Sequence, residues 1–106
     1  MRPVAWCLFL LKRNTEANTY YNQLLSLEPN TSDFLNAGHV AFSLGQKEKA
    51  IDHYLNSIRT RQDDIKSFVK SFNKDRKHLI SNEIEPIEIA LMLDYLRFGK
   101  RDGFFV

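Results

Sequence analysis

The sequence predicts an all-α fold made of several short helices. Apolar residues recur three and four positions apart along most of the chain, as they do on one face of an α-helix. No long segment alternates apolar and polar residues as a half-buried β-strand does. Helix punctuation supports the prediction, because Pro29, Gly45 and Gly99 follow periodic segments and Pro86 opens one.

The composition fits one soluble, folded domain. The chain has 106 residues, of which 43% are apolar and 26% charged. The chain has 15 basic and 13 acidic residues. The resulting net charge of +2 gives no reason to expect nucleic-acid binding. Cys7 is the only cysteine, which excludes an intrachain disulfide and a zinc site built from several cysteines. Its apolar neighbours predict a buried, inert thiol.

The first helix is expected in the apolar run Val4–Leu11. A basic start before an apolar run is also typical of a secretory signal peptide. This run has only eight residues, however, and no small-residue cleavage site follows it. It is also too short to cross a bilayer. We therefore expect a core helix, no membrane association and a cytoplasmic location.

The next two helices are delimited by their end signals. The second starts near Thr15 and stops before Pro29, since the residue before a proline disfavours helix. Ser32 or Asp33 is expected to cap the third helix through a side-chain oxygen. Gly45 ends that helix.

A fourth helix is expected from Lys47 to about Arg59. The remaining expected helices lie in the C-terminal third of the chain. Asp63 or Asp64 is expected to cap a helix whose apolar residues fall at i, i+3, i+4 and i+7, namely Ile65, Phe68, Val69 and Phe72. A short turn through His78 and Leu79 follows, with Asn73 as its expected cap. The last helix runs from Pro86 to Gly99.

The chain resembles itself at an offset of 33 residues. Identical residues pair as Phe9 with Phe42, Leu11 with Leu44, Ala17 with Ala50 and Tyr21 with Tyr54, and similar ones pair as Leu25 with Ile58 and Ala5 with Gly38. These positions are where paired helices pack most tightly, so the offset indicates a helical repeat.

With these residues the sequence resembles the tetratricopeptide repeat family, whose repeat is a helix–turn–helix of about 34 residues. The resemblance implies a right-handed solenoid of antiparallel helix pairs in one structural domain. Residues 1–62 would form two repeats, the first truncated at its N-terminus; residues 63–98 would form capping helices and residues 99–106 a loose tail. The positions that pack the repeats would be Ala5, Ala17, Tyr21, Gly38, Gly45, Ala50 and Tyr54. The sequence departs from the family pattern at Lys12, Ala41 and Gln62, where a turn glycine, an aromatic residue and a proline are usual. The ending NEIEPIEIALMLDYLRF resembles the C-terminal part of larger bacterial repeat proteins.

The resemblance also implies a non-enzymatic module or scaffold that binds a peptide or a partner helix in a concave groove. The groove residues would be Trp6, Phe9, Leu35, Asn36, His39 and Phe42. Two alternatives remain open: Trp6, Phe9 and Phe42 are core or oligomer contacts, or the chain is an assembly fragment that forms a homodimer through its apolar N-terminal helix. The partner's identity does not follow from the sequence.

No catalytic, metal or cofactor site is expected. The three histidines, His39, His53 and His78, lack the i, i+4 spacing of helical metal ligands. Glu83, Glu85 and Glu88 surround a helix start, where negative charge is favourable. The basic stretch at residues 70–78 is interrupted by Asp75 and is expected to be a solvated face.

Overall fold

A computed structural model describes residues 2–99 of the chain. The expected tail therefore lies outside the described residues beyond Gly99. The described part is helical throughout, which confirms the all-α prediction. Its helices are α1 (Arg2–Leu10), α2 (Asn14–Leu25), α3 (Thr31–Ser43), α4 (Lys47–Arg59), α5 (Ile65–Lys74), α6 (Arg76–Ser81) and α7 (Pro86–Phe98).

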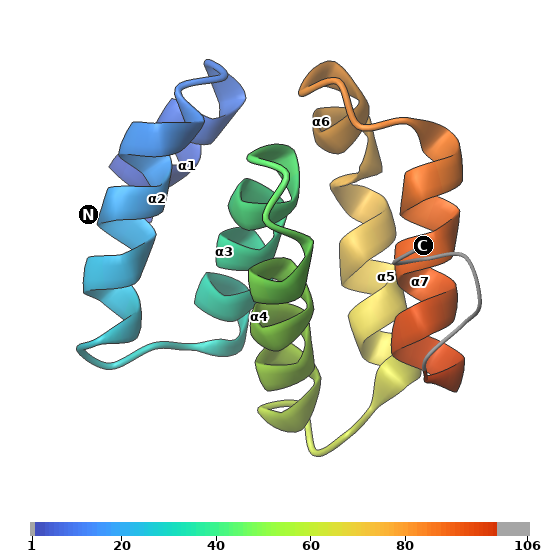
Figure 1. Cartoon of the computed structure of the whole chain (residues 1–106). Helices are drawn as coiled ribbons and strands as arrows, with labels where there is room; N and C mark the ends of the chain where they lie inside the picture. The colour runs from blue at the N-terminus through green and yellow to red at the C-terminus, as the bar shows by residue number, and fades with distance from the viewer. Residues whose placement is uncertain (1, 100–106) are drawn as a thin grey trace.

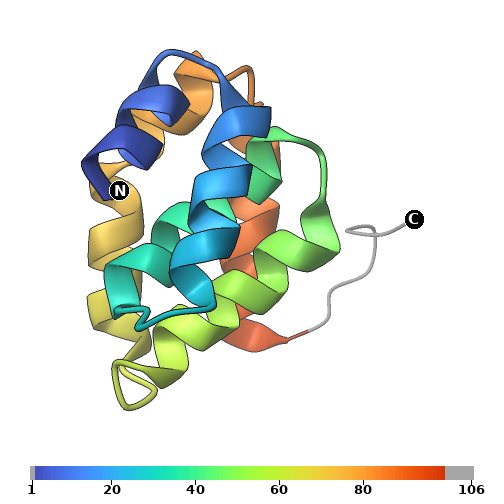
Figure 2. The same cartoon turned by 90° about the vertical axis from the view of Figure 1, so that its left-hand side faces the viewer.

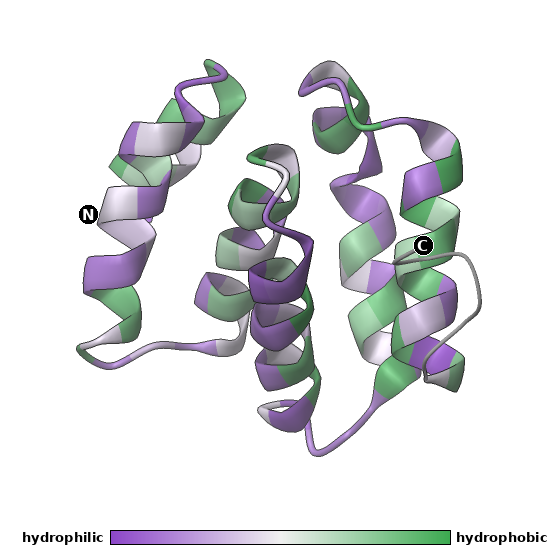
Figure 3. Ribbon diagram, viewed as in Figure 1, coloured by the Kyte–Doolittle hydropathy of each residue, from purple (hydrophilic) through white to green (hydrophobic). Residues whose placement is uncertain are grey.

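The helices stand side by side in three layers, which gives the predicted solenoid (Figure 1). The first layer is the pair α1 and α2, the second is α3 and α4, and the third holds α5, α6 and α7. Apolar side chains gather between the layers, and polar residues cover much of the outer surface of α4 (Figure 3). The core is continuous from Ala5 on α1 to Leu93 on α7.

The layers approach closely where the sequence repeat places small residues. Ala17 and Ala50 are fully buried, as are the repeated tyrosines Tyr21 and Tyr54 and the small residue Ala5. Gly38 faces Tyr54, and Gly45 occupies the turn between α3 and α4 with φ of 78°.

Helix α3 begins two or three residues earlier than the expected caps imply. Asn30 is the cap: its side chain accepts a hydrogen bond from the backbone N–H of Asp33 at 2.8 Å. The Asp33 carboxylate accepts the Asn30 N–H at 3.0 Å and so completes a capping box. The same carboxylate accepts Arg2 Nε at 2.9 Å, which ties α1 to α3. The prediction of Ser32 or Asp33 as the cap was wrong, because the four consecutive residues 30–33 all carry suitable side-chain oxygens.

The other cap predictions had mixed outcomes. Asp64, one of the two predicted caps of α5, accepts the backbone N–H of Ser67 at 3.1 Å. Helix α5 runs through Lys74, so Asn73 lies inside it and caps nothing. Pro86 stands in the first turn of α7 and Gly99 follows its end.

Four helices end in the same closed turn, in which the residue directly after the left-handed position bonds back to the helix. The backbone N–H of Arg13, Gln46, Asp63 and Ile84 donates to a carbonyl five residues earlier, at 2.8, 2.9, 3.0 and 3.1 Å. Only the second of these turns has a glycine at the left-handed position; the others have Lys12, Gln62 and Glu83, with φ of 63°, 57° and 69°. A side chain there costs about 1 kcal/mol or more.

The outer side of α1 is more exposed than expected. Leu8 and Phe9 are buried, but Val4 and Leu10 have 48% and 40% of their surface exposed and Cys7 is also exposed. The prediction of a buried thiol was wrong, because α1 belongs to the layer at one end of the described helices and only one side of it meets the core.

Candidate protein-binding groove

A hollow of about 370 Å³ lies where α1, α3 and α5 meet. These are the first helices of the three layers, and Figure 2 shows α1 and α5 along the same side of the molecule. The hollow is lined by Trp6, Ser32, Leu35, Asn36, Arg61, Ser71, Lys74 and Asp75. Three of the six predicted groove residues, Trp6, Leu35 and Asn36, are therefore brought together.

The Trp6 ring is half-buried and held by its neighbours. Its centroid lies 5.2 Å from that of Phe9 on the same helix and 5.6 Å from that of His78, which it meets edge-on. Aromatic pairs of this kind favour one ring orientation. Trp6 therefore offers a pre-positioned apolar surface to a ligand in the hollow.

The opposite side of the hollow is polar and largely basic. Arg61 follows α4 and reaches α5, where its Nη1 donates to Ser67 Oγ at 3.1 Å and to Ser71 Oγ at 3.0 Å. Its Nε is buried and has no hydrogen-bond partner among the residues described. Lys74 is exposed at the end of α5. Hydrogen-bond donors thus face the apolar surface of Trp6 across the hollow.

The other three predicted groove residues do not line this hollow. Phe9, His39 and Phe42 have at most 1% of their surface exposed. Helix α5 lies over them: the His39 ring is 5.2 Å from that of Phe72 and 6.4 Å from that of Phe9. Their assignment to an open groove needs correction, because the C-terminal helices turn this part of α3 into core.

His39 is the centre of a buried hydrogen-bond network. Its Nε2 lies 3.1 Å from Asp75 Oδ2, and its Nδ1 lies 2.8 Å from the Tyr54 hydroxyl. Because a carboxylate only accepts, Nε2 carries the proton, and the Tyr54 hydroxyl donates to Nδ1. Burial lowers the pKa of His39, although the neighbouring Asp75 partly opposes this shift. Burial also raises the pKa of the Tyr54 phenol. The network is neutral at its centre and joins the second and third layers.

A second polar contact fixes α6 against the first layer. The buried Asn82 donates through Nδ2 to the carbonyl of Phe9 at 3.4 Å and accepts from Asn14 Nδ2 at 3.1 Å. The carbonyl of Phe9 is near the end of α1 and also accepts the backbone N–H of Lys12 at 3.0 Å. The segment after α6 therefore closes the end of α1.

Sequence reasoning missed the contributions of Arg61, Lys74 and Asp75 to the hollow. Applied once more, the 33-residue offset pairs His39 of α3 with Phe72 of α5. The rings of these two residues are in contact, so the offset was a signal that α5 packs against α3. No comparable signal exists for Arg61, which lies in a connection between helices.

The family comparison agrees with this arrangement of layered helix pairs. The sequence model described as tetratricopeptide repeat matches residues 4–31 and 34–64, which is more than half of the chain. The chain belongs to the tetratricopeptide repeat family. The comparisons with curated proteins and with solved structures found no match.

Tetratricopeptide repeats generally mediate protein–protein interaction and are typically non-enzymatic. Within residues 2–99, no three metal-binding side chains gather in a way that would hold an ion. No helix in that part of the chain has the length and apolar character needed to traverse a membrane.

Proposed function

We propose that this tetratricopeptide repeat chain binds an extended peptide or a partner helix in the hollow between α1, α3 and α5. The observation that carries the proposal is the convergence of Trp6, Asn36 and Lys74 from three different layers on one hollow. Residues 1–62 then act as two repeats and residues 63–98 as the cap that completes the groove.

The side chains indicate the chemistry of the ligand. Trp6 suits an apolar side chain, and Asn36 can hydrogen-bond a peptide backbone through its amide. The exposed ammonium group of Lys74 favours a carboxylate or a carbonyl oxygen on the same ligand. A peptide with an apolar anchor next to an acidic residue fits these groups best.

Trp6 provides the readout, because it is the only tryptophan of the chain. A displayed peptide library would be selected against the immobilised chain, and the selected peptides titrated while Trp6 emission is followed. We expect saturable binding with a change in emission. Lys74→Glu should weaken binding about tenfold, as expected for losing a charged hydrogen bond. Lys66→Glu is the matched control, because Lys66 is also an exposed lysine of α5 but lies outside the hollow. Equal binding by both variants would contradict the proposal.

A second candidate is self-association through α1, which the exposed Leu11 and Val4 favour. In this case Leu11→Glu should lower the molecular mass measured by light scattering without unfolding the chain. An unchanged mass would exclude α1 as the contact.

A further inference from the structure

Helix α7 is apolar on two opposite sides. Its inner side is buried in the core through Ile89, Met92 and Leu93. Ile87, Leu91 and Phe98, at i, i+4 and i+11, fall together on the outer side, with Asp94 at i+7 between them. Ile87 and Phe98 have 64% and 63% of their surface exposed, and Leu91 is half-buried. Exposed apolar side chains gathered on one side of a helix give this side the character of an interface.

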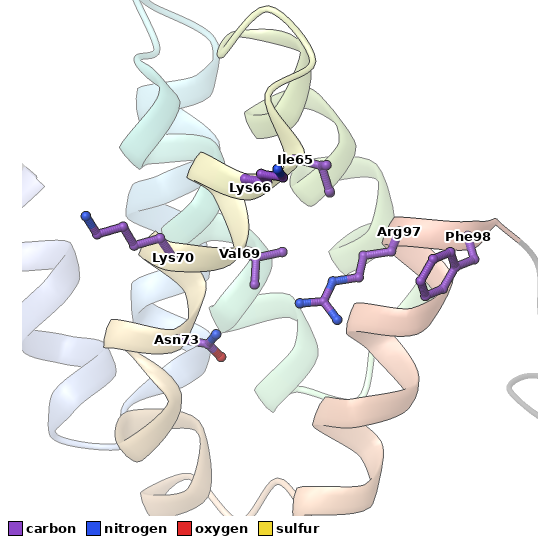
Figure 4. Close-up of a pocket in the computed structure, with 7 residues that line it drawn as sticks. All are labelled: Ile65, Lys66, Val69, Lys70, Asn73, Arg97 and Phe98. Atoms are coloured by element: carbon purple, nitrogen blue, oxygen red, sulfur yellow. The ribbon is translucent and has the colours of Figure 1, made fainter.

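A pocket of about 520 Å³ lies at the C-terminal end of α7, between α7 and α5 (Figure 4). Ile65, Val69 and Phe98 supply apolar lining, and every charged residue that lines the pocket is basic, namely Lys66, Lys70 and Arg97. Arg97 reaches from α7 toward α5 in Figure 4. The pocket therefore suits an apolar side chain that has carboxylates beside it.

The N-terminal end of the same helix offers such a group. Glu83 and Glu85 are exposed just before α7, and the exposed Ile87 follows them directly in its first turn. Glu88 completes the acidic end and pairs with Lys47 of α4 at 3.3 Å. One end of α7 thus carries an apolar side chain flanked by acids, and the other end carries an apolar pocket flanked by bases.

We propose that two copies of this chain form a dimer by pairing their α7 helices in antiparallel orientation. Ile87 of each copy enters the pocket beside Phe98 of the other copy, and Glu85 approaches the other copy's Arg97. A helix of 13 residues is about 20 Å long. The two contacts are therefore well separated. They are identical and related by a two-fold axis, as in an isologous interface.

The charges favour a second copy over the chain's own C-terminal segment as the occupant of the pocket. That segment carries two bases, Lys100 and Arg101, against one acid, Asp102, whereas the stretch before α7 carries Glu83 and Glu85 and no base. The acidic end of α7 cannot reach the pocket of its own helix, because both are fixed at opposite ends of one rigid rod. A second copy supplies the complementary charge at both ends.

The test is the molecular mass of the full chain, measured by light scattering and sedimentation over a dilution series. We expect a reversible dimer whose dissociation constant rises with ionic strength, since the complementary charges are exposed. Ile87→Glu should raise that constant at least about tenfold, through the loss of one buried apolar side chain per contact. Leu11→Glu is the matched control, because Leu11 is exposed to 66% against 64% for Ile87 but lies after α1.

Exchanging the charges gives a sharper test, because it predicts that association is restored as well as lost. Glu85→Arg places a base against the other copy's Arg97, and Arg97→Glu places an acid against the other copy's Glu85. Each variant should be monomeric alone, the two mixed together should form a heterodimer, and the double variant should dimerise like the unmodified chain. Both residues are exposed, so neither change disturbs the core.

Three results would overturn the proposal. The first is an unmodified chain that stays monomeric at the highest concentration measured. The second is a dimer that Leu11→Glu dissociates and Ile87→Glu does not, which would place the contact on the N-terminal side. The third is a pair of charge variants that fail to recover association when mixed.

Discussion

Gly38 of α3 packs directly against the ring of Tyr54 of α4. A Cβ atom added to Gly38 would lie 2.5 Å from Cε1 and 2.6 Å from Cδ1 of that ring, closer than such atoms approach in proteins. The Tyr54 ring cannot simply move away. It is fully buried, its hydroxyl is bonded to His39, and its centroid lies 5.4 Å from that of Phe72. The close packing of α3 against α4 therefore requires a residue without a Cβ atom at position 38.

Gly38→Ala should accordingly destabilise the fold by about 1–3 kcal/mol, the usual cost of overpacking a core. This loss should appear although alanine favours helix over glycine by about 1 kcal/mol. Urea unfolding followed by circular dichroism measures it. In a Tyr54→Leu background the same change should be nearly neutral or stabilising, because the ring is gone. An equal cost in both backgrounds would show that Tyr54 is not the obstacle.

The sequence and the structure assign the cap of α3 to different residues, and substitutions can tell the two assignments apart. Asn30→Ala should cost about 1 kcal/mol, since it leaves the backbone N–H of Asp33 without its acceptor. Ser32→Ala should change the free energy of unfolding by less than about 0.5 kcal/mol, as at other surface positions. Chemical denaturation of the two variants gives both values. The reverse order would restore Ser32 as the cap.

Lys12 occupies a left-handed turn position that glycine fills between α3 and α4. Lys12→Gly should stabilise the fold by about 0.5–1 kcal/mol, because it removes the steric cost of a side chain at φ of 63°. Lys49→Gly is the control, since Lys49 is an exposed residue inside α4, where glycine should cost about 1 kcal/mol. Thermal unfolding of both variants measures the changes. A loss of stability in Lys12→Gly would mean that the lysine side chain contributes more than its backbone strain costs.

The buried His39 network predicts a stability that depends on pH. Burial lowers the pKa of His39 below its ordinary value of 6.5, so the unfolded chain takes up a proton that the folded chain does not. The contribution is therefore fully present above pH 6.5 and is lost as the pH falls through that value. His53, whose pKa burial also lowers, acts in the same direction. We expect the free energy of unfolding to fall less on acidification in His39→Gln than in the unmodified chain.

Nuclear magnetic resonance of the imidazole protons checks the same point directly. The His39 signals should titrate at lower pH than those of a histidine in a short peptide. A titration at or above the ordinary value would mean that Asp75 outweighs burial.

The groove shows where sequence reasoning reached its limit. Trp6, Leu35 and Asn36 line a common hollow, because the repeat register fixes which side of α1 and α3 faces inward. His39 and Phe42 lie on nearly the same side of α3, yet they are core. Whether they face a ligand or another helix depends on α5, and nothing in α3 itself encodes the position of that helix.

The sequence by itself determined the helices, their order and the close approach of the layers. Apolar spacing, proline and glycine act over a few residues, and the helix–turn–helix formed by α3 and α4 brings Gly38 against Tyr54. Only the tertiary structure decided which surfaces stay open. The contact of His39 with Asp75 spans 36 residues and that of Asn82 with Phe9 spans 73. Such contacts form because distant helices are packed together, and a helix sequence specifies its own faces but not what covers them.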